Sequence, residues 1–258
     1  MLKEQRKRKI IDLIEANKQV FIAELADQFN VSEMTIRRDL DELGQTGVIQ
    51  RIHGGAIIIE RSEINYELPI IERSHEQAKE KQKIAEKIVS MIQDGEKIFL
   101  GSGTTTLAIA EKLHHHHDLT VLTNAITIIN CLIPMKNITL IVFGGFLRRA
   151  ELSMIGHFTQ EALKDIQVDK VIIGIRGIHI EQGLTSDHLQ ELYTDQAILK
   201  LSKIIIIAAD HTKFGHVAAI RTAPITSASM IVTDDQAPDE MINQIRSLGV
   251  IVLKTNQH

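Results

Sequence analysis

The chain of 258 residues is 44% hydrophobic and 24% charged, with a formal net charge of −4 at pH 7. These values are typical of a globular protein with one large domain or two, and every apolar run is too short to span a bilayer. The single cysteine, Cys131, excludes an internal disulfide and a cysteine-cluster metal site. No apolar stretch of signal-peptide length follows the charged start, so we expect a cytoplasmic protein without a cofactor or metal.

The first part of the chain predicts three short helices and a hairpin. Hydrophobic residues recur at helical spacing in three segments, and Ser32 is a good N-cap for the third of them. The stretch VIQRIHGGAIII alternates in hydrophobicity around a glycine pair, which is typical of a hairpin. The predicted elements are helices over residues 3–16, 22–29 and 32–43, and strands on either side of Gly54-Gly55. Together they outline a winged helix-turn-helix DNA-binding domain over residues 1–58.

The third predicted helix has the pattern of a recognition helix. Ile36, Leu40 and Leu43 share one stripe that would face the other helices. The outer face offers hydroxyl and guanidinium groups, which bind phosphate or base edges, and the hairpin would reach the DNA backbone or the minor groove. The candidate DNA-binding residues are Ser32, Met34, Thr35, Arg37, Arg38, Arg51 and His53. A helix with a solvated arginine face would show the same periodicity, so the pattern alone leaves both interpretations open.

Basic side chains gather at the start of the chain although the net charge is negative. They are Lys3, Arg6, Lys7, Arg8 and Lys9. Because DNA responds to where charge is placed rather than to its sum, this cluster is compatible with DNA binding.

Residues 59–74 have no clear period and contain Pro69, so we expect an interdomain linker there. Beyond it, runs of β-branched residues alternate with helical patterns, which favours a mostly parallel sheet covered by helices on both faces. The strand candidates are residues 97–101, 119–123, 138–143, 170–175, 203–209, 230–234 and 250–253. The helix candidates are residues 76–92, 107–113, 125–132, 158–166, 188–201 and 240–248. The sequence therefore predicts an α/β domain over residues 75–258.

The stretch FLGSGTTT places a small-residue loop between a predicted strand and a predicted helix. Gly101 and Gly103 would let the backbone approach an anion, and the threonines add hydroxyls to the free N–H groups of the helix start. Other strand ends carry Thr123, Asn124, Gly144, Gly145, Asp210 and Lys213. An ordinary turn explains GSGTTT taken alone, but several such loops at the carboxyl ends of strands favour a phosphate-binding site.

Two parts of the chain resemble the DeoR family of bacterial transcriptional regulators. LADQFNVSEMTIRRDLDELGQTGVIQRIHGGA is similar to the DNA-binding segment of that family, within a match over roughly residues 3–57. This match implies a winged helix-turn-helix with its helix-turn-helix proper near residues 20–39. Over about residues 75–255, the motifs GSGTTT, TN, GG, GIRG, GLT and DHTKFG follow the order of the family's sensor domain. That domain is similar in fold to ribose-5-phosphate isomerase and the coenzyme A transferases, and in the family it binds a phosphorylated sugar or a related metabolite.

The resemblance implies a repressor of a carbohydrate-metabolism operon whose affinity for DNA is controlled by a phosphorylated sugar. Its partners are then operator DNA, the sugar phosphate and further copies of itself in a dimer or tetramer, because a symmetric operator matches protein symmetry. The predicted effector-binding residues are Gly101, Ser102, Gly103, Thr104, Thr105, Thr106, Thr123, Asn124, Gly144, Gly145, Arg176, Glu191, Asp210 and Lys213.

One motif departs from the family. Related isomerases and many members have an acidic residue in a G-x-D-G pattern where this chain has Arg176, and many relatives have Asp where it has Gly101. An isomerase of that type needs a carboxylate to move protons, and arginine cannot be that base. We therefore predict a protein that is not an enzyme, with Arg176 as a second phosphate clamp. The alternatives are a sugar-phosphate isomerase or transferase that retains a nucleic-acid-binding module, and a binding module that does not respond to a metabolite.

Four consecutive histidines, His114–His117, resemble a metal-binding tract. Consecutive side chains point in different directions and no cysteine or carboxylate cluster supports them, so we interpret the run as an exposed turn. Glu191 is compatible both with a hydroxyl acceptor in the pocket and with a solvated helix face.

Overall fold

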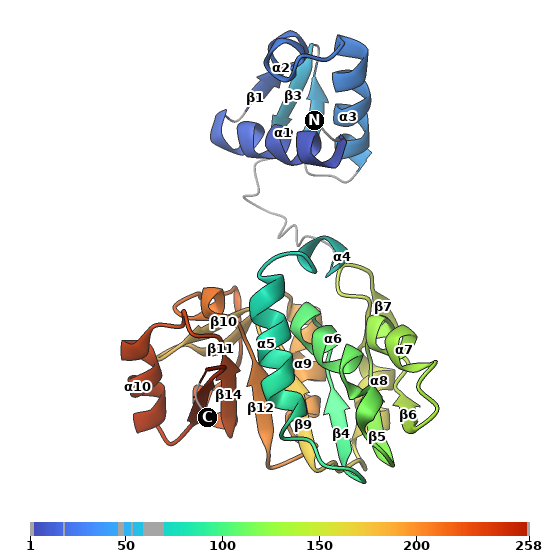
Figure 1. Ribbon diagram of the computed structural model, residues 1–258, viewed down its shortest axis with the longest axis vertical. Coiled ribbons are helices and arrows are strands. Elements are labelled where there is room, and N and C mark those ends of the chain that lie inside the picture. Colours follow the sequence, from blue (N-terminus) through green and yellow to red (C-terminus); the bar gives the residue numbers. More distant parts are fainter. Residues whose placement is uncertain (1–2, 18, 46–48, 53, 59–69, 257–258) are drawn as a thin grey trace. The chain divides into compact units, whose positions relative to one another are not determined.

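The structure, a computed structural model, describes residues 3–17, 19–45, 49–52, 54–58 and 70–256. The chain divides into two compact units, residues 1–67 and residues 68–258. We call them the N-terminal unit and the C-terminal unit and describe each by itself (Figure 1).

In its described residues, the N-terminal unit contains three helices and a three-stranded antiparallel sheet. The elements are α1 (Lys3–Asn17), β1 (Gln19–Phe21), α2 (Ile22–Phe29), α3 (Glu33–Gln45), β2 (Ile49–Ile52) and β3 (Gly55–Ile58). The strand order is β1-β3-β2, and the predicted hairpin is confirmed by pairing of Ile49 with Ile58 and of Ile52 with Gly55. The sequence did not predict β1, because three residues are too few to show a period.

A small hydrophobic core holds these helices together. Ile36 and Leu40 of α3 are fully buried and pack in one cluster with Ile10 and Ile14 of α1 and Leu25 of α2. This confirms the predicted inward stripe of α3. Because that stripe is held by the core, the opposite side of the helix is left to solvent.

All seven predicted strands of the C-terminal unit form one sheet. They are β4 (Lys97–Leu100), β5 (Leu119–Thr123), β6 (Ile138–Val142), β9 (Lys170–Ile173), β12 (Ile205–Ala208), β14 (Met230–Thr233) and β15 (Ile251–Lys254). The order is β15-β14-β12-β9-β4-β5-β6, and every pairing is parallel. The carboxyl ends of all seven strands therefore lie at one edge, where the following loops build a site.

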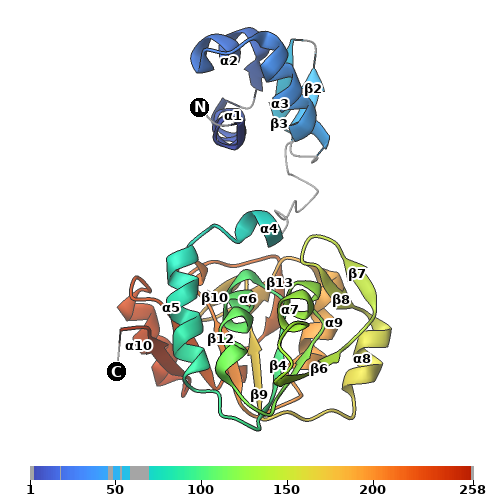
Figure 2. The ribbon, with the colours of Figure 1, turned by 45° about the vertical axis from the view of Figure 1, so that its right-hand side comes forward.

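Helices cover both faces of this sheet (Figure 2). One face packs against α5 (Ala78–Val89), α6 (Thr104–Glu111) and α7 (Ile126–Leu132). The other packs against α8 (His157–Leu163), α9 (Leu189–Ile198) and α10 (Asp239–Ser247). Three short 3-10 helices are η1 (Leu113–His115), η2 (His211–Lys213) and η3 (Ile225–Ser227). Because both faces are covered, a central strand such as β12 is buried along its whole length.

Two small antiparallel sheets accompany the large one. They consist of β7 (Phe146–Arg148) with β8 (Ser153–Ile155), and of β10 (Gly177–His179), β11 (Gly183–Ser186) and β13 (Ile220–Ala223) in that order. The sequence did not predict them, because they are not continuous apolar runs and are too short to show a reliable alternation.

A short helix, α4 (Ile70–Arg73), lies within the stretch that we expected to be linker. The Ile70 side chain is buried, and its backbone N–H donates to the carbonyl of Ala150 at 2.8 Å. These contacts join α4 to the C-terminal unit. Residues 59–69 of the expected linker lie outside the described residues.

The histidine run lies in a surface turn around η1. His114 and His115 are exposed, and Nδ1 of His116 lies 3.2 Å from Oδ1 of Asp94. In the described ranges, no three His, Cys, Asp or Glu side chains come together as a metal-binding group. Nor does any described helix have the length and hydropathy needed to cross a membrane.

Candidate functional site

The turn between α2 and α3 positions the start of the candidate recognition helix. Asn30 ends α2 in a left-handed conformation with φ of 52°. Oγ of Ser32 accepts a hydrogen bond of 3.2 Å from the backbone N–H of Thr35, and the two hydroxyls lie 2.9 Å apart. Ser32 therefore caps α3 as predicted, and the cap holds both hydroxyls at the helix start.

The outer face of α3 carries the other predicted DNA-binding side chains. Met34 is 58% exposed, and Arg37 and Arg38 are exposed as well. Nη2 of Arg37 lies 3.2 Å from Oε2 of Glu33, a surface pair with both side chains more than half exposed. Such a pair is weak enough to exchange for a phosphate contact. DNA contact by these residues stays a prediction.

Arg51 connects the hairpin to the candidate recognition helix. Its Nε donates to Oδ1 of Asp41 at 3.0 Å, and its Nη1 donates to the carbonyl of Gly55 at 2.8 Å. Arg51 thus fixes β2 and β3 against α3, a structural role that the sequence did not suggest. The other predicted hairpin contact, His53, lies outside the described residues.

Three of the five basic residues near the start of the chain pair with acidic residues of α3. Nε of Arg6 lies 2.5 Å from Oδ2 of Asp39, and both side chains are buried. Nζ of Lys3 and Nζ of Lys7 lie 2.6 and 2.5 Å from the Glu42 carboxylate. Hydrogen bonds from these two lysines lower the pKa of Glu42 to about 2. Much of the basic cluster therefore attaches α1 to α3.

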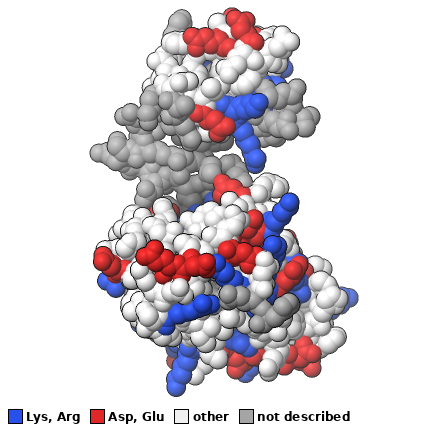
Figure 3. Space-filling model, turned by 60° about the vertical axis from the view of Figure 1, so that its left-hand side comes forward, with Lys and Arg blue, Asp and Glu red and all other residues white. Residues whose placement is uncertain are grey.

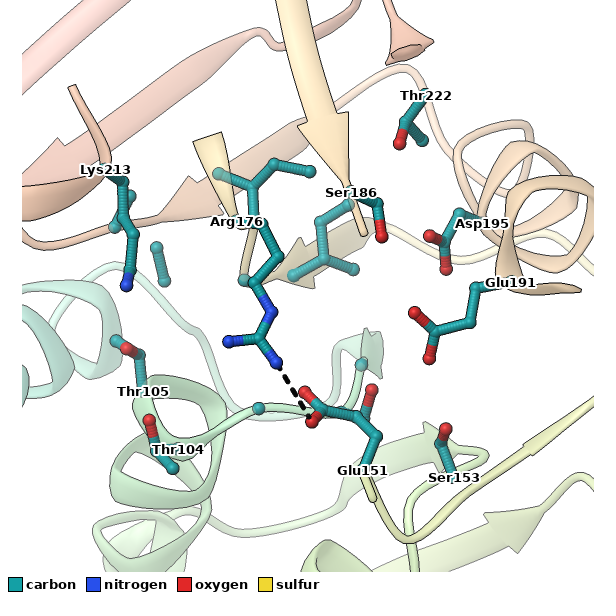
Figure 4. A pocket seen from close by; sticks show the side chains of 18 of the residues that line it. Thr104, Thr105, Glu151, Ser153, Arg176, Ser186, Glu191, Asp195, Lys213 and Thr222 are labelled. Atoms are coloured by element: carbon teal, nitrogen blue, oxygen red, sulfur yellow. Dashed lines mark ion pairs between the residues drawn. The ribbon is translucent and has the colours of Figure 1, made fainter. Parts of the chain in front are cut away.

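A pocket opens at the carboxyl ends of β4, β9 and β12 (Figure 4). Loops after these strands line it together with side chains from α4, α5, α9 and η2. Ten predicted effector-binding residues are among the lining residues: Gly101, Ser102, Gly103, Thr104, Thr105, Asn124, Arg176, Glu191, Asp210 and Lys213. The parallel topology therefore brings these distant motifs together, as the sequence led us to expect.

One end of the pocket combines a helix N-terminus with a lysine. The helix α6 begins after Gly103, whose φ of 138° favours glycine, and no side chain among the described residues caps it. Its first N–H groups are therefore available to an anion. Gly101 leaves no room for a side chain, because a Cβ would lie 2.8 Å from Cγ2 of Ile173. Lys213 points toward the threonines of this helix start (Figure 4).

Two further groups support the lysine end. Asp210 caps η2 by accepting a hydrogen bond of 3.0 Å from the backbone N–H two residues on, which orients the segment that carries Lys213. Nζ of Lys81 donates to the carbonyls of Arg73 and Glu76 at 2.9 and 2.5 Å. Burial lowers the pKa of Lys81, and the Asp210 carboxylate opposes this shift.

Four predicted effector-binding residues are not part of the pocket lining. The hydroxyls of Thr106 and Thr123 donate to backbone carbonyls at 2.9 and 2.7 Å. At Gly145 a Cβ would overlap the hydroxyl of Thr159, whereas at Gly144 it would meet nothing within 4 Å. Thr106, Thr123 and Gly145 thus have roles in folding, and the carbonyl of Gly144 accepts a hydrogen bond of 2.8 Å from the Thr159 hydroxyl.

Arg176 belongs to a chain of charged groups on the pocket wall. Its Nη2 lies 3.8 Å from Oε2 of Glu151, and its Nε lies 3.8 Å from Oδ2 of Asp187. The Glu151 carboxylate, which is buried, also pairs with Arg73 of α4. The loop after β9 is therefore linked to α4 through Glu151. A phosphate contact by Arg176 stays a prediction.

Two carboxyl groups of α9 face the pocket at the end opposite Lys213 (Figure 4). They belong to Glu191 and Asp195. Glu191 is only 9% exposed and therefore does not lie on a solvated helix face. Oε1 of Glu191 accepts from Nη1 of Arg148 at 2.5 Å. Burial raises the pKa of both Glu191 and Asp195, and in Asp195 the neighbouring Glu191 carboxylate adds to the effect of burial.

The sequence missed several side chains of the pocket lining. They are Arg73, Lys81, Glu151, Ser153, Ser186, Asp195 and Thr222. Only Asp195 left a signal, because it follows Glu191 by four residues and shares its helix face. Most of the others come from the expected linker or from short strands that show no period.

The carboxylates of the pocket bear on the question of catalysis. Arg176 cannot act as a base, but Glu151, Glu191 and Asp195 line the same pocket. The identity of residue 176 therefore does not decide between binding and catalysis.

Comparison with known proteins gives a family match in each of the two units. The DeoR-like helix-turn-helix domain matches residues 6–62, and the DeoR C terminal sensor domain matches residues 76–235. The chain is 36% identical to the uncharacterized HTH-type transcriptional regulator FruR of Bacillus subtilis (strain 168), over 91% of this chain and 92% of that protein. It is 34% identical to the glycerol-3-phosphate regulon repressor of Escherichia coli (strain K12), over 92% and 93%. A solved ribose 5-phosphate isomerase from Plasmodium falciparum gives a TM-score of 0.39 at 18% identity, over 52% of each chain.

Proposed function

The chain belongs to the DeoR family of transcriptional regulators, and we propose that it represses a carbohydrate-metabolism operon under the control of a phosphorylated sugar bound in the pocket. Its relatives are named as regulators and repressors, and it is a regulator rather than an enzyme. The observation that carries the proposed effector class is the meeting of an uncapped helix N-terminus and Lys213 in one pocket.

We assign operator binding to the outer face of α3. The hydroxyls of Ser32 and Thr35 lie at the helix start, where a recognition helix approaches base edges, and Arg38 is exposed one turn further on. The face of the C-terminal unit in Figure 3 intersperses basic and acidic side chains instead of presenting one broad basic area. The match of the DeoR-like helix-turn-helix domain to residues 6–62 supports DNA binding through the N-terminal unit.

The phosphate group fits the end of the pocket at α6. A dianionic phosphate accepts several hydrogen bonds, which the backbone N–H groups and threonine hydroxyls of the helix start supply. The Lys213 ammonium adds a mobile positive charge. The sugar part would then extend toward the carboxyl and hydroxyl groups at the other end of the pocket.

We place the link between effector and DNA binding in α4. This helix precedes the C-terminal unit's first long helix and follows residues 59–69, through which the chain reaches the N-terminal unit. Arg73 of α4 lines the pocket and pairs with Glu151, which is also close to Arg176. An effector that changes these ion pairs alters the anchoring of α4, and with it the connection to the DNA-binding unit.

We further propose a cytoplasmic homo-oligomer. A symmetric operator has two half-sites about 34–36 Å apart, and two recognition helices related by a twofold axis match this spacing. Effector binding would change the arrangement of the two helices and therefore the affinity for both half-sites.

Thermal denaturation with a panel of pentose and hexose phosphates tests the effector class. A ligand that binds only the native state raises the melting temperature, by an amount that grows with ligand concentration. We expect a rise with at least one sugar phosphate, none with the unphosphorylated sugar, and a smaller rise in Lys213→Ala. Equal shifts with and without phosphate would contradict the proposed class.

A further inference from the structure

The acidic end of the pocket contains a carboxylate that forms no ion pair with a described residue. Glu151 pairs with Arg73, and Glu191 pairs with Arg148. For Asp195, the described part of the chain provides no side-chain hydrogen bond and no ion pair, although the group lines the pocket. Its pKa is raised, chiefly by burial and next by the neighbouring Glu191 carboxylate, and the Arg148 guanidinium opposes this shift.

Two buried hydroxyls of the pocket lining also have no hydrogen-bond partner among the described residues. Oγ1 of Thr222 and Oγ of Ser153 make no hydrogen bond to any described residue, and the residues are 4% and 1% exposed. Both line the pocket, and Figure 4 shows them on the same side of it as Glu191 and Asp195. Buried polar atoms are nearly always bonded in native proteins, so open ones that face a cavity indicate a ligand group.

The hydrogen-bonding capacity of the carboxylate and the two hydroxyls determines which kind of ligand group they can bind. An ionised carboxylate only accepts hydrogen bonds, and hydroxyls accept as readily as they donate. The matching ligand group therefore carries several donors and a positive charge. A primary ammonium has three donors and one charge, whereas a sugar hydroxyl has a single donor and no charge. A metal ion does not fit, since the described side chains offer no cluster of three suitable ligands.

We infer that the effector is an amino-sugar phosphate, whose ammonium group binds to Asp195 while its phosphate binds at the start of α6. Glu191 and the hydroxyls of Thr222 and Ser153 line the same end of the pocket. This inference rests on the proposed phosphate site and adds the class of sugar that it serves. Asp195 is thus a residue that determines specificity among phosphorylated sugars.

Matched pairs of ligands test the inference by isothermal titration with the full chain. Glucosamine, galactosamine and mannosamine 6-phosphates are compared with glucose, galactose and mannose 6-phosphates, and 1-amino-1-deoxyfructose 6-phosphate is compared with fructose 6-phosphate. We expect at least one amine to bind about tenfold or more tightly than its hydroxyl partner, the effect of one charge-assisted hydrogen bond in a buried site. N-Acetylglucosamine 6-phosphate, which lacks the charge, should lose any advantage that the free amine has.

The variant Asp195→Asn assigns the preference to one residue. It keeps the shape of the side chain and removes the charge, so the affinity for the amine should fall more than the affinity for its hydroxyl partner, and the amine should lose its advantage. Asp165→Asn, an exposed aspartate in the loop after α8, is the matched control and should behave like the wild type. Circular dichroism melting curves establish that both variants are folded.

The outcomes separate this inference from the proposed function. Equal or weaker binding of every amine compared with its hydroxyl partner would overturn the inference alone. A preference for the amine that persists in Asp195→Asn would overturn the assignment to Asp195. If no sugar phosphate of either kind binds, the proposed phosphate-controlled function fails as well.

Discussion

Replacing Arg6 with alanine is expected to destabilise the N-terminal unit strongly. The side chains of Arg6 and Asp39 are 9% and 2% exposed, and Nε of Arg6 lies 2.5 Å from Oδ2 of Asp39. A second bond joins Nη2 to Oδ1 at 3.3 Å. Removing one partner of a buried pair leaves an uncompensated charge and costs about 3–5 kcal/mol. That loss is a large part of the roughly 5–15 kcal/mol that stabilises a domain.

Hydrogen exchange followed by mass spectrometry on the full chain measures this effect in each unit. The most protected amides of α1, α2 and α3 should exchange about a hundredfold faster or more, while those of β4 and β9 in the C-terminal unit keep their rates. Arg37→Ala is the matched control. Its pair with Glu33 is more than half exposed on both sides and is worth about 0–1 kcal/mol.

A double substitution separates charge from packing. Arg6→Met combined with Asp39→Leu replaces the pair with apolar side chains, which is often neutral or stabilising. We expect protection close to that of the wild type. Unchanged exchange in Arg6→Ala, or the same acceleration in Arg37→Ala, would refute the buried-pair argument.

Further substitutions test the two sites and the link between them. Arg38→Ala should weaken operator binding and reduce the slope of log affinity against log salt by about 1, as measured by fluorescence anisotropy; an unchanged slope would exclude a phosphate contact. Gly145→Ala should lower the melting temperature because its Cβ has no room, whereas Gly144→Ala should not; the reverse order would contradict the packing. The pKa of the Asp195 carboxyl is raised, so its contribution to stability is complete below the unfolded value of about 4 and is lost as pH rises through the folded value. The melting temperature of Asp195→Asn relative to the wild type should therefore increase from acid toward neutral pH, and a constant difference would contradict the shift. Arg73→Ala should leave sugar-phosphate affinity within a few fold in titration calorimetry and abolish the effect of the ligand on DNA affinity; a full response would exclude α4 as the link.

The large sheet could be predicted from the sequence because its strands are buried on both faces. Where continuous apolar runs such as residues 203–209 alternate with helical segments, they indicate buried strands of a parallel sheet. The three- and four-residue strands β7, β8, β10, β11 and β13 could not be predicted, because they are neither continuous apolar runs nor long enough to show a period.

The same distinction applies to the pocket. Gly101, Gly103 and Lys213 follow strands of the parallel sheet, and the topology dictates that such loops meet. Arg73 reaches the pocket from the four-residue helix α4 and Glu151 from the turn between β7 and β8, so only the folded chain shows that they pair there. The basic cluster at the start of the chain could be seen in the sequence, but its role could not. The sequence shows the charge of Arg6 but does not show that this side chain is buried against the Asp39 carboxylate.

The central claim is that the pocket controls the affinity of α3 for an operator. Fluorescence anisotropy of the full chain at fixed salt, with DNA from upstream of its own operon and a scrambled duplex, tests it most directly. We predict sequence-selective binding, and a change in operator affinity of about 5- to 150-fold with a phosphorylated sugar that also binds in the absence of DNA. Equal affinity for both duplexes, or an operator affinity that no bound sugar phosphate changes, would contradict the account.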